Sequence, residues 1–369
     1  MKQTKKNSSA LAGLILSVVL LALVIFLENS GLVPPTHILF TVLKKGAVYS
    51  LVAVSMNLLN GFTGLFSLGQ AGFMLLGAYT YAILTVPTDV RDSVYYLYGG
   101  SAIHFSLQEL FGSIFGNSGV GGAISLVLGV LLGLILAGCV AAFFAYLIGL
   151  PVLRLKSDYL AIATLGFAEI LRAVFQWQKL GPVTNGANMI KSFPIFSSFN
   201  IKAGGKVVLY LSTFVPFLLT IICVAIIVLL INSTYGRAFK AIRDDEIAAE
   251  AMGINLASHK RMSFIISSFF AGISGAMLAM YQASVQATTF KSSMTYEILL
   301  IVVIGGIGSV SGSIIASFLF IASSEWLLRF LDNETYIGGF RLPLLRSGFR
   351  MVVFSIIIMA VVLFFRKGI

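Results

Sequence analysis

Charged side chains are scarce in this sequence. Asp, Glu, Lys and Arg together make up 11% of the 369 residues, whereas soluble domains carry roughly 25%. Hydrophobic residues reach 58%. A chain with so few charges cannot cover its surface with groups that water solvates, so lipid must cover it. The composition therefore excludes a soluble protein and indicates an integral membrane protein.

Cysteine and histidine are also rare. Cys139 and Cys223 lie inside apolar runs, where a thiol behaves as a small hydrophobic side chain. His37, His104 and His259 lie in three separate stretches at no metal-ligand spacing. We expect no disulfide framework, no metal site and no cofactor.

Catalytic motifs are missing as well. The sequence contains no GxxxxGK[ST] loop for ATP phosphates, no HExxH and no GxSxG beside a helical histidine. We therefore expect that the chain is not an enzyme, and that any ATP hydrolysis it depends on takes place on separate chains.

Positive charge is in excess, with a formal net charge of +11. Basic residues in a membrane protein orient the chain and contact anionic lipid headgroups. No RNA- or DNA-binding motif accompanies them. Membrane lipid, and not nucleic acid, is the expected partner of this charge.

Apolar stretches of spanning length recur along the chain. Their backbones must be helical, because they are far too long for barrel strands. The sequence predicts an all-α polytopic bundle of about nine or ten transmembrane elements, some broken, in one domain over residues 1–369. The first stretch looks like a retained helix, since no small-x-small cleavage site follows it. The stretches lie near 10–27, 38–60, 66–86, 121–150, 159–177, 207–231, 262–283, 296–328 and 348–365.

Three polar segments interrupt the apolar pattern. Residues 232–261 gather five basic residues, so the positive-inside rule places this loop in the cytoplasm. Residues 87–120 and 178–206 are then expected to be extracytoplasmic loops. The 296–328 stretch is long for one helix and carries glycines at 305, 306 and 308, which predicts a break there.

Within the basic loop, residues 244–253 predict a short helix. Asp244 or Asp245 can cap its first turn, and Gly253 can end it in the left-handed conformation. Ala248 and Ala249 are small enough for another surface to approach closely. Such a helix suits docking into a partner's groove; the alternative is an ordinary solvated loop.

The loop resembles the coupling loop of ABC importer permeases, in which an Ala-Ala pair is followed four residues later by Gly. Ala248, Ala249 and Gly253 match, although Ile247 stands at the usual acidic position and Glu246 precedes it. The wider string resembles the branched-chain amino acid importer permeases. The resemblance implies that contacts to the ATPase involve Arg237, Arg243, Glu246, Ala248, Ala249, Glu250 and Gly253.

Further segments resemble the same family, and together the matches span roughly residues 46–320. They are Met56-Asn57-Leu58-Leu59-Asn60-Gly61 continuing to Gly77-Ala78-Tyr79, Asp158 to Phe167 with Glu169-Ile170-Leu171-Arg172 and Thr184-Asn185-Gly186, and Gly305-Gly306-Ile307-Gly308-Ser309. The resemblance implies a multi-pass permease subunit in a bacterial or archaeal cytoplasmic membrane that imports leucine, isoleucine and valine. Its implied partners are ABC ATPase subunits, a second homologous permease and an extracytoplasmic substrate-binding protein. The alternatives are a permease for another amino acid or urea, and an ion-coupled secondary transporter.

Two sets of polar side chains inside the spans each allow two interpretations. A break in a helix frees backbone groups, which is tolerable only inside protein or along a wet cavity. Asn57, Asn60 and Gln70, with the glycines Gly305, Gly306 and Gly308, are therefore candidates for the translocation pathway, unless the amides only join helices. Glu169 and Arg172 share one helix face. They are either part of a pathway or proton relay, or a neutralised structural pair, which is the interpretation we favour.

Overall fold

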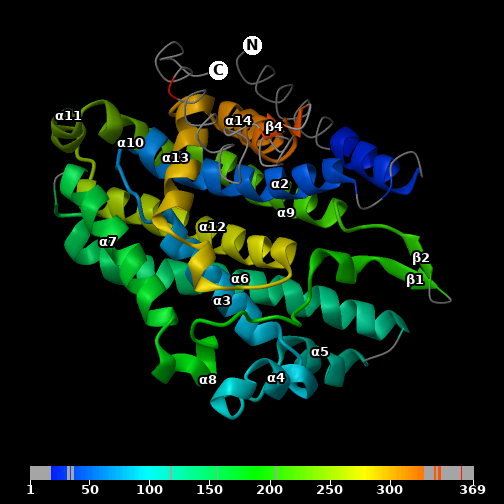
Figure 1. Cartoon of the computed structure of the whole chain (residues 1–369). Coiled ribbons are helices and arrows are strands. Elements are labelled where there is room, and N and C mark those ends of the chain that lie inside the picture. Colours follow the sequence, from blue (N-terminus) through cyan, green and yellow to red (C-terminus); the bar gives the residue numbers. More distant parts are fainter. Residues whose placement is uncertain are drawn as a thin grey trace.

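The computed structural model describes residues 18–30, 34, 37–116, 119–155, 157–203, 206–327, 336–337, 340–341 and 359. Over these ranges the chain is a bundle of helices that cross one another at varied angles (Figure 1). The longer helices are Val18–Asn29, α2 (Ile38–Asn57), α3 (Gln70–Thr85), α6 (Gly119–Val152), α7 (Ser157–Phe175), α9 (Phe214–Ile231), α12 (Leu256–Gln282), α13 (Ser292–Gly305) and α14 (Val310–Ala322).

Short elements connect the long helices. Two π-helical turns, η1 (Leu58–Phe62) and η6 (Ser323–Leu327), continue α2 and α14. Strands β1 (Ile201–Ala203) and β2 (Lys206–Leu209) form an antiparallel hairpin. The others are α4 (Thr88–Val94), η2 (Tyr96–Tyr98), α5 (Leu107–Phe115), η3 (Gln178–Leu180), α8 (Gly181–Thr184), η4 (Phe196–Phe199), α10 (Thr234–Asp244), α11 (Glu246–Ala251), η5 (Ala287–Thr289) and the strand pair β3 (Tyr336–Ile337) and β4 (Phe340–Arg341).

The predicted all-α membrane class is confirmed. In the described part of the chain, four helices are long and apolar enough to cross a membrane: Ile38–Phe62, Gly119–Val152, Phe214–Ile231 and Leu256–Gln282. The bent pair Tyr159–Phe175 and Gln178–Thr184, with 63° between its halves, would make a fifth. The total number of crossings stays a prediction, because the 348–365 stretch and most of 10–27 lie outside the residues that the structure describes, apart from Met359 and the helix from Val18.

Burial separates central from outer helices. The most apolar windows of α12 and α2 are 78% and 67% buried, whereas those of α6 and α9 are 39% and 33% buried. The outer helices expose large apolar side chains such as Leu131, Phe143 and Leu229, as a lipid-facing surface requires. The core is therefore built around α12, with α2 and α3 against it.

Glycine lets α3 and α12 approach closely. A Cβ on Gly77 would lie 2.0 Å from the carbonyl oxygen of Gly272, and one on Gly275 would lie 2.0 Å from the carbonyl oxygen of Met74. Lipid tails are as apolar as the helices, so close packing of this kind is a main source of helix association in membranes. These glycines fix the crossing at the centre of the bundle.

Three predicted helix starts are wrong. The apolar run that begins at Val207 was expected to be helical throughout, but its first residues form strand β2, and α9 begins only at Phe214. β-Branched Val207 and Val208 suit a strand, and Thr213 stands at the N-cap. The stretch predicted from residue 66 becomes helical only at Gln70, and the helix predicted from residue 262 begins earlier, at Leu256.

The two segments expected as extracytoplasmic loops pack on each other. The Tyr95 hydroxyl donates to the carbonyl oxygen of Val183 at 2.9 Å, and the amide of Ala102 donates to Pro182 at 2.9 Å. Burial raises the pKa of Tyr95 to about 12, partly offset by the nearby Arg91 guanidinium. The segments 87–120 and 178–206 thus form one polar layer.

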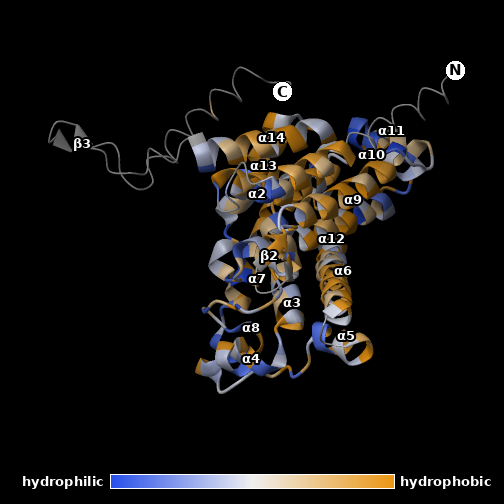
Figure 2. Cartoon of the chain, turned by 90° about the vertical axis from the view of Figure 1, so that its right-hand side faces the viewer, coloured by the Kyte–Doolittle hydropathy of each residue, from blue (hydrophilic) through white to orange (hydrophobic). Residues whose placement is uncertain are grey.

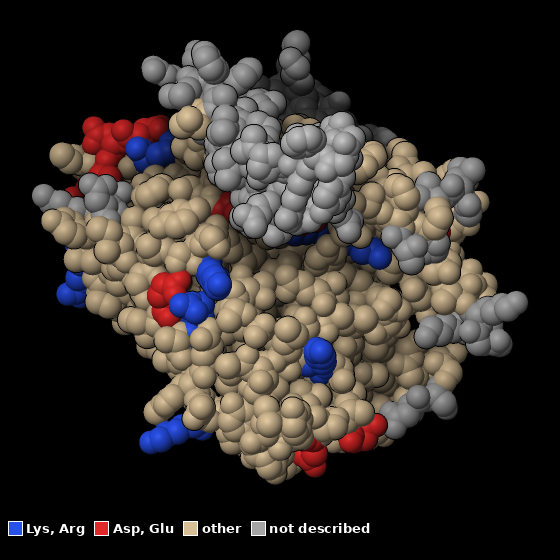
Figure 3. All heavy atoms as spheres, viewed as in Figure 1, with Lys and Arg blue, Asp and Glu red and all other residues tan. Residues whose placement is uncertain are grey.

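Hydrophilic residues gather at two ends of the bundle. Figure 2 shows the blue-coloured residues concentrated around α10 and α11 and, at the opposite end, around α4 and α8, with orange helices between them. Figure 3 shows few charges over the middle of one face, with acidic and basic side chains together at the end that carries α11. The basic loop and the polar layer therefore lie at opposite ends of the apolar bundle.

Candidate functional site

The loop between α9 and α12 folds into two short helices, α10 and α11. Asp245 caps α11, because its Oδ1 accepts hydrogen bonds from the amides of Ile247 at 2.9 Å and Ala248 at 3.0 Å. Gly253 follows the helix with φ of +84°, and the amide of Ile254 donates back to Ala249. Both ends are closed as the sequence predicts, with Asp245 and not Asp244 as the cap.

The two alanines of α11 face different ways. Ala249 is 4% exposed and packs inside the chain, whereas Ala248 is exposed. Ile247 and Met252 are 82% and 83% exposed. Of the pair that the sequence singles out, only Ala248 is exposed in this chain, and contact of either alanine with an ATPase stays a prediction. The sequence candidates did not include Ile247 and Met252, although two large apolar residues in a charged loop were a usable signal.

The charged candidates of this loop divide into paired and surface groups. Glu246 accepts from Lys260 Nζ at 2.6 Å, which ties α11 to the start of α12. Arg243 pairs with Asp244 at 3.0 Å. Arg237 and Glu250 are exposed.

The predicted glycine break is present between α13 and α14. Residues 306–309 are not helical, and Gly306 and Gly308 have φ of +92° and +85°, a region that favours glycine. Gly305 faces Gly312 so closely that a Cβ on it would lie 2.5 Å from the Gly312 backbone. α13 and α14 therefore fold back on each other at this point.

Asn57 satisfies the backbone of that break. Its side chain is fully buried. Its Oδ1 accepts from the amide of Gly308 at 2.8 Å, and its Nδ2 donates to the carbonyl of Ser309 at 2.9 Å and to Ser313 Oγ at 2.7 Å. One amide at the end of α2 thus replaces the hydrogen bonds that the break removes.

Residues 61–77 are a second glycine-rich segment, and its first glycine meets the break segment 305–312; we call these two segments the glycine-rich interruptions. A Cβ on Gly61 would lie 2.5 Å from the amide nitrogen of Gly308. Arg243, at the end of α10, donates from Nη1 to the carbonyl oxygen of Gly61 at 3.0 Å. We call Asn57, Gly61, Arg243 and Gly308 the junction. It joins the α10–α11 loop to both interruptions.

The other two amides are engaged within the chain. Gln70 is buried, and its Nε2 donates to Ser267 Oγ of α12 at 3.0 Å. Asn60 accepts from the amide of Ser67 at 3.3 Å and holds the turn after η1. These bonds, like those of Asn57, fit the helix-joining alternative; a role of the three amides in the translocation pathway stays a prediction.

Glu169 and Arg172 form an ion pair on α7. Glu169 Oε2 accepts from Arg172 Nη2 at 2.6 Å and from Nε at 2.7 Å. Its other oxygen accepts from the amide of Ser292 at 3.2 Å and from the Ser292 hydroxyl. The carboxylate therefore also holds the first turn of α13 against α7, which fits a structural pair.

Glu169→Gln should lower stability more than it lowers transport per folded molecule. The change leaves the Arg172 guanidinium without its counter-charge, and removing one partner of a buried ion pair costs about 3–5 kcal/mol. The pair is 27–35% exposed here, so we expect about 1–2 kcal/mol after solvent screening. The melting temperature of the detergent-solubilised protein checks this, with Glu250→Gln, a change at an exposed glutamate of α11, as the control. An unchanged melting temperature together with lost uptake would instead indicate a relay.

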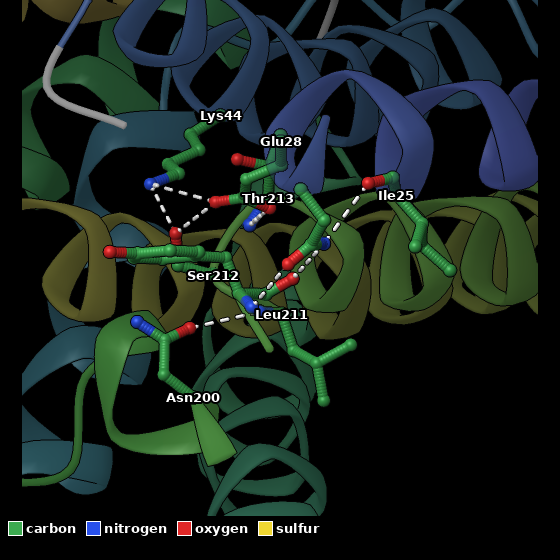
Figure 4. Close-up of polar contacts among 9 residues, drawn as sticks. Ile25, Glu28, Lys44, Asn200, Leu211, Ser212 and Thr213 are labelled. Carbon is green, nitrogen blue, oxygen red and sulfur yellow. Dashed lines mark hydrogen bonds and ion pairs between the residues drawn. The ribbon is translucent and has the colours of Figure 1, made fainter. Parts of the chain in front are cut away.

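A buried carboxylate lies at the start of α9. Glu28, at the end of the helix Val18–Asn29, accepts from Ser212 Oγ at 2.5 Å and from the amide of Thr213 at 3.0 Å (Figure 4). Lys44 Nζ also donates to Ser212 Oγ at 2.6 Å. The carboxylate stands at the N-terminus of α9, where the helix dipole favours negative charge. This cluster anchors the first described helix to α2 and α9.

Comparison with known proteins agrees with this architecture. Residues 38–364 match the family model described as branched-chain amino acid transport system / permease component. The chain is 31% identical to the high-affinity branched-chain amino acid transport system permease protein LivM of Salmonella typhimurium, over 79% of this chain and 64% of that protein. LivM of Escherichia coli matches with the same identity and coverage. The chain thus spans less than two thirds of the length of these relatives, 64%.

More distant relatives show the same pattern. The probable branched-chain amino acid transport permease protein LivM of Methanocaldococcus jannaschii is 26% identical over 72% of this chain and 74% of that protein. No solved structure shows a significant match. The family match covers most of the sequence, including α10, α11 and both glycine-rich interruptions. The chain belongs to the family of permease components of branched-chain amino acid transport systems.

Proposed function

We propose that this chain is the transmembrane permease subunit of an ATP-driven ABC importer in a bacterial or archaeal cytoplasmic membrane, with leucine, isoleucine and valine as substrates. The family and the LivM relatives support the substrate class. The sequence has no phosphate-binding loop, so ATP hydrolysis is assigned to separate ATPase chains. The permease itself carries out no covalent chemistry.

Two exposed apolar side chains, which we call the α11 tip, carry this proposal. Ile247 lies in the first turn of α11 and Met252 at its C-cap, both are more than 80% exposed, and the helix is capped at both ends. Burying such a side chain in a partner contributes about 1.5–3 kcal/mol. An apolar tip on a rigid helix, surrounded by charges, suits insertion into a groove of the ATPase. We place residues 232–261 in the cytoplasm for this reason and because of their basic residues.

The α7 ion pair supports a second permease subunit as a further partner. Charged groups that face lipid inside a span are costly. Glu169 and Arg172 are nevertheless partly exposed on α7. We infer that this face of α7 meets protein or a wet pathway between two permeases. The same carboxylate is held by Arg172 and Ser292, which gives little support to an ion-coupled secondary transporter.

Ile247→Asp should release the ATPase from the permease. Loss of a buried hot-spot side chain typically costs at least about 2 kcal/mol, or roughly thirtyfold in affinity. The measurement is co-purification of the ATPase and substrate-stimulated ATP hydrolysis in vesicles that contain the assembled importer. Leu155→Asp, which changes an exposed apolar residue after α6, is the control. If the ATPase stays bound and stimulated with Ile247→Asp, α11 is not the docking element.

A further inference from the structure

Arg243 stands where the docking loop touches the membrane bundle. It lies in the last turn of α10, two residues before the Asp245 cap of α11. α10 itself is fixed to the bundle, since Phe239 and Ile242 are 0% and 1% exposed and Lys240 Nζ lies 5.6 Å from the centre of the Phe62 ring. A displacement of α11 therefore reaches the bundle through the end of α10 as well as through the Glu246–Lys260 ion pair to α12.

The Arg243 guanidinium joins two groups at once. Nε and Nη2 donate to Asp244 Oδ1 at 3.1 and 3.0 Å, and Nη1 donates to the Gly61 carbonyl at 3.0 Å. The Gly61 carbonyl is accessible because η1 ends at Phe62, and the last carbonyls of a helix have no partner within the helix. A planar fork can hold a carboxylate and a carbonyl together, whereas an ammonium group is a single point charge.

The glycines around Arg243 leave room for this contact. A Cβ on Gly308 would lie 3.0 Å from Arg243 Nη1, and one on Gly64 would lie 3.0 Å from Arg243 Cγ. The Gly308 amide is in turn held by Asn57 at 2.8 Å. A short chain of contacts thus runs from α11 through Arg243 to η1 and on to the break between α13 and α14.

We infer that Arg243 is a positioning residue that transmits movement of α11 to the junction and so couples ATP hydrolysis to the opening of the break between α13 and α14. This inference rests on the proposed function. It assigns Arg243 a role in transmission, separate from the docking role of the α11 tip. Because each contact at the junction is to backbone or to a fixed amide, the coupling does not require Arg243 to touch substrate.

The test uses the complete importer in vesicles, with labelled leucine uptake and ATP hydrolysis measured together. With Arg243→Ala we expect the ATPase to co-purify at the wild-type level and the uptake per ATP hydrolysed to fall about tenfold, within the range of known coupling effects. With Arg243→Lys we expect a fall of about threefold, since the charge stays but the fork is lost. Arg154→Ala, an exposed arginine after α6, is the control and should keep the wild-type ratio.

Several outcomes would overturn the inference. If Arg243→Ala keeps the wild-type uptake per ATP hydrolysed, transmission through Arg243 is excluded. If Arg243→Ala loses ATPase binding, Arg243 belongs to the docking surface instead. If the alanine variant fails to fold, the ratio of the lysine variant decides in the same way. If the wild-type chain neither binds an ATPase nor takes up leucine, the proposed function fails, and that result is distinct from a failure of the Arg243 inference.

Discussion

Gly77→Ala is expected to prevent accumulation of the folded protein in the membrane. The new Cβ would lie 2.0 Å from the carbonyl oxygen of Gly272 and 2.6 Å from its Cα. These are backbone atoms, so no side-chain rotation relieves the collision, and α3 must move away from α12. Ordinary overpacking costs about 1–3 kcal/mol, and separation of two central helices should exceed that.

The measurement is the yield of monodisperse protein after solubilisation from membranes. Gly166→Ala is a matched control, because a Cβ on this exposed glycine of α7 meets nothing within 4 Å. The control should express at least as well as wild type, since alanine is about 1 kcal/mol better than glycine inside a helix. A normal yield of Gly77→Ala would contradict the close crossing of α3 and α12.

The sequence predicted that glycines would matter in this bundle but did not distinguish their roles. A glycine inside a spanning helix permits either close packing or a break. Gly77 permits close packing, whereas Gly306 lies in a break. The run of three glycines within four residues at 305–308 favoured a break there, and the structure has one. The helix that Gly77 meets, α12, is nearly 200 residues away in sequence, so no local pattern could name it.

For the polar amides, too, the local sequence did not identify the partner. From the sequence, Asn57 could line a cavity or join helices. The choice depends on the residues opposite it, and those belong to a break about 250 residues further along the chain. The capped helix α11 was predictable because its signals, Asp245 and Gly253, are local. Which side of so short a helix faces inward was not, and Ala249 turned out to be buried.

The end of the bundle that carries Glu28 was predicted least well. The sequence treated Glu28 only as part of the segment after the first helix. In the structure it accepts from the N-cap residue of α9, Thr213, and from Ser212. The error in the start of α9 and the missed role of Glu28 have one cause: only four residues separate the apolar strand β2, which ends at Leu209, from the apolar helix that begins at Phe214, and Ser212 and Thr213, which bind Glu28, lie in this short connection. Hydrophobicity alone does not mark a boundary between two apolar elements.

Asn57→Leu is expected to abolish uptake while the protein still inserts. The leucine side chain has the same number of heavy atoms and the same branching as that of asparagine but neither donates nor accepts hydrogen bonds. The amide of Gly308 loses its acceptor, and a backbone group left unsatisfied inside the protein costs about 1–3 kcal/mol. The Ser309 carbonyl loses the Asn57 donor at 2.9 Å but keeps the amide and the hydroxyl of Ser313, at 3.2 and 3.0 Å. The expected cost of about 1–3 kcal/mol is enough to displace the break from its present geometry.

Uptake of labelled leucine per inserted molecule measures the effect, and we expect a fall of more than about tenfold, which corresponds to about 1.4 kcal/mol. Asn232→Leu is the control, because Asn232 is exposed and bonds only locally, to Val228 at 2.9 Å. Asn57→Asp removes only one of the two bonds, the one that Asn57 donates to Ser309. It keeps the acceptor for Gly308 but turns a negative oxygen toward the Ser309 carbonyl, so it should also lose uptake. Near-normal uptake with leucine at position 57 would show that the break holds its shape without this amide, and the junction would then have no part in transport.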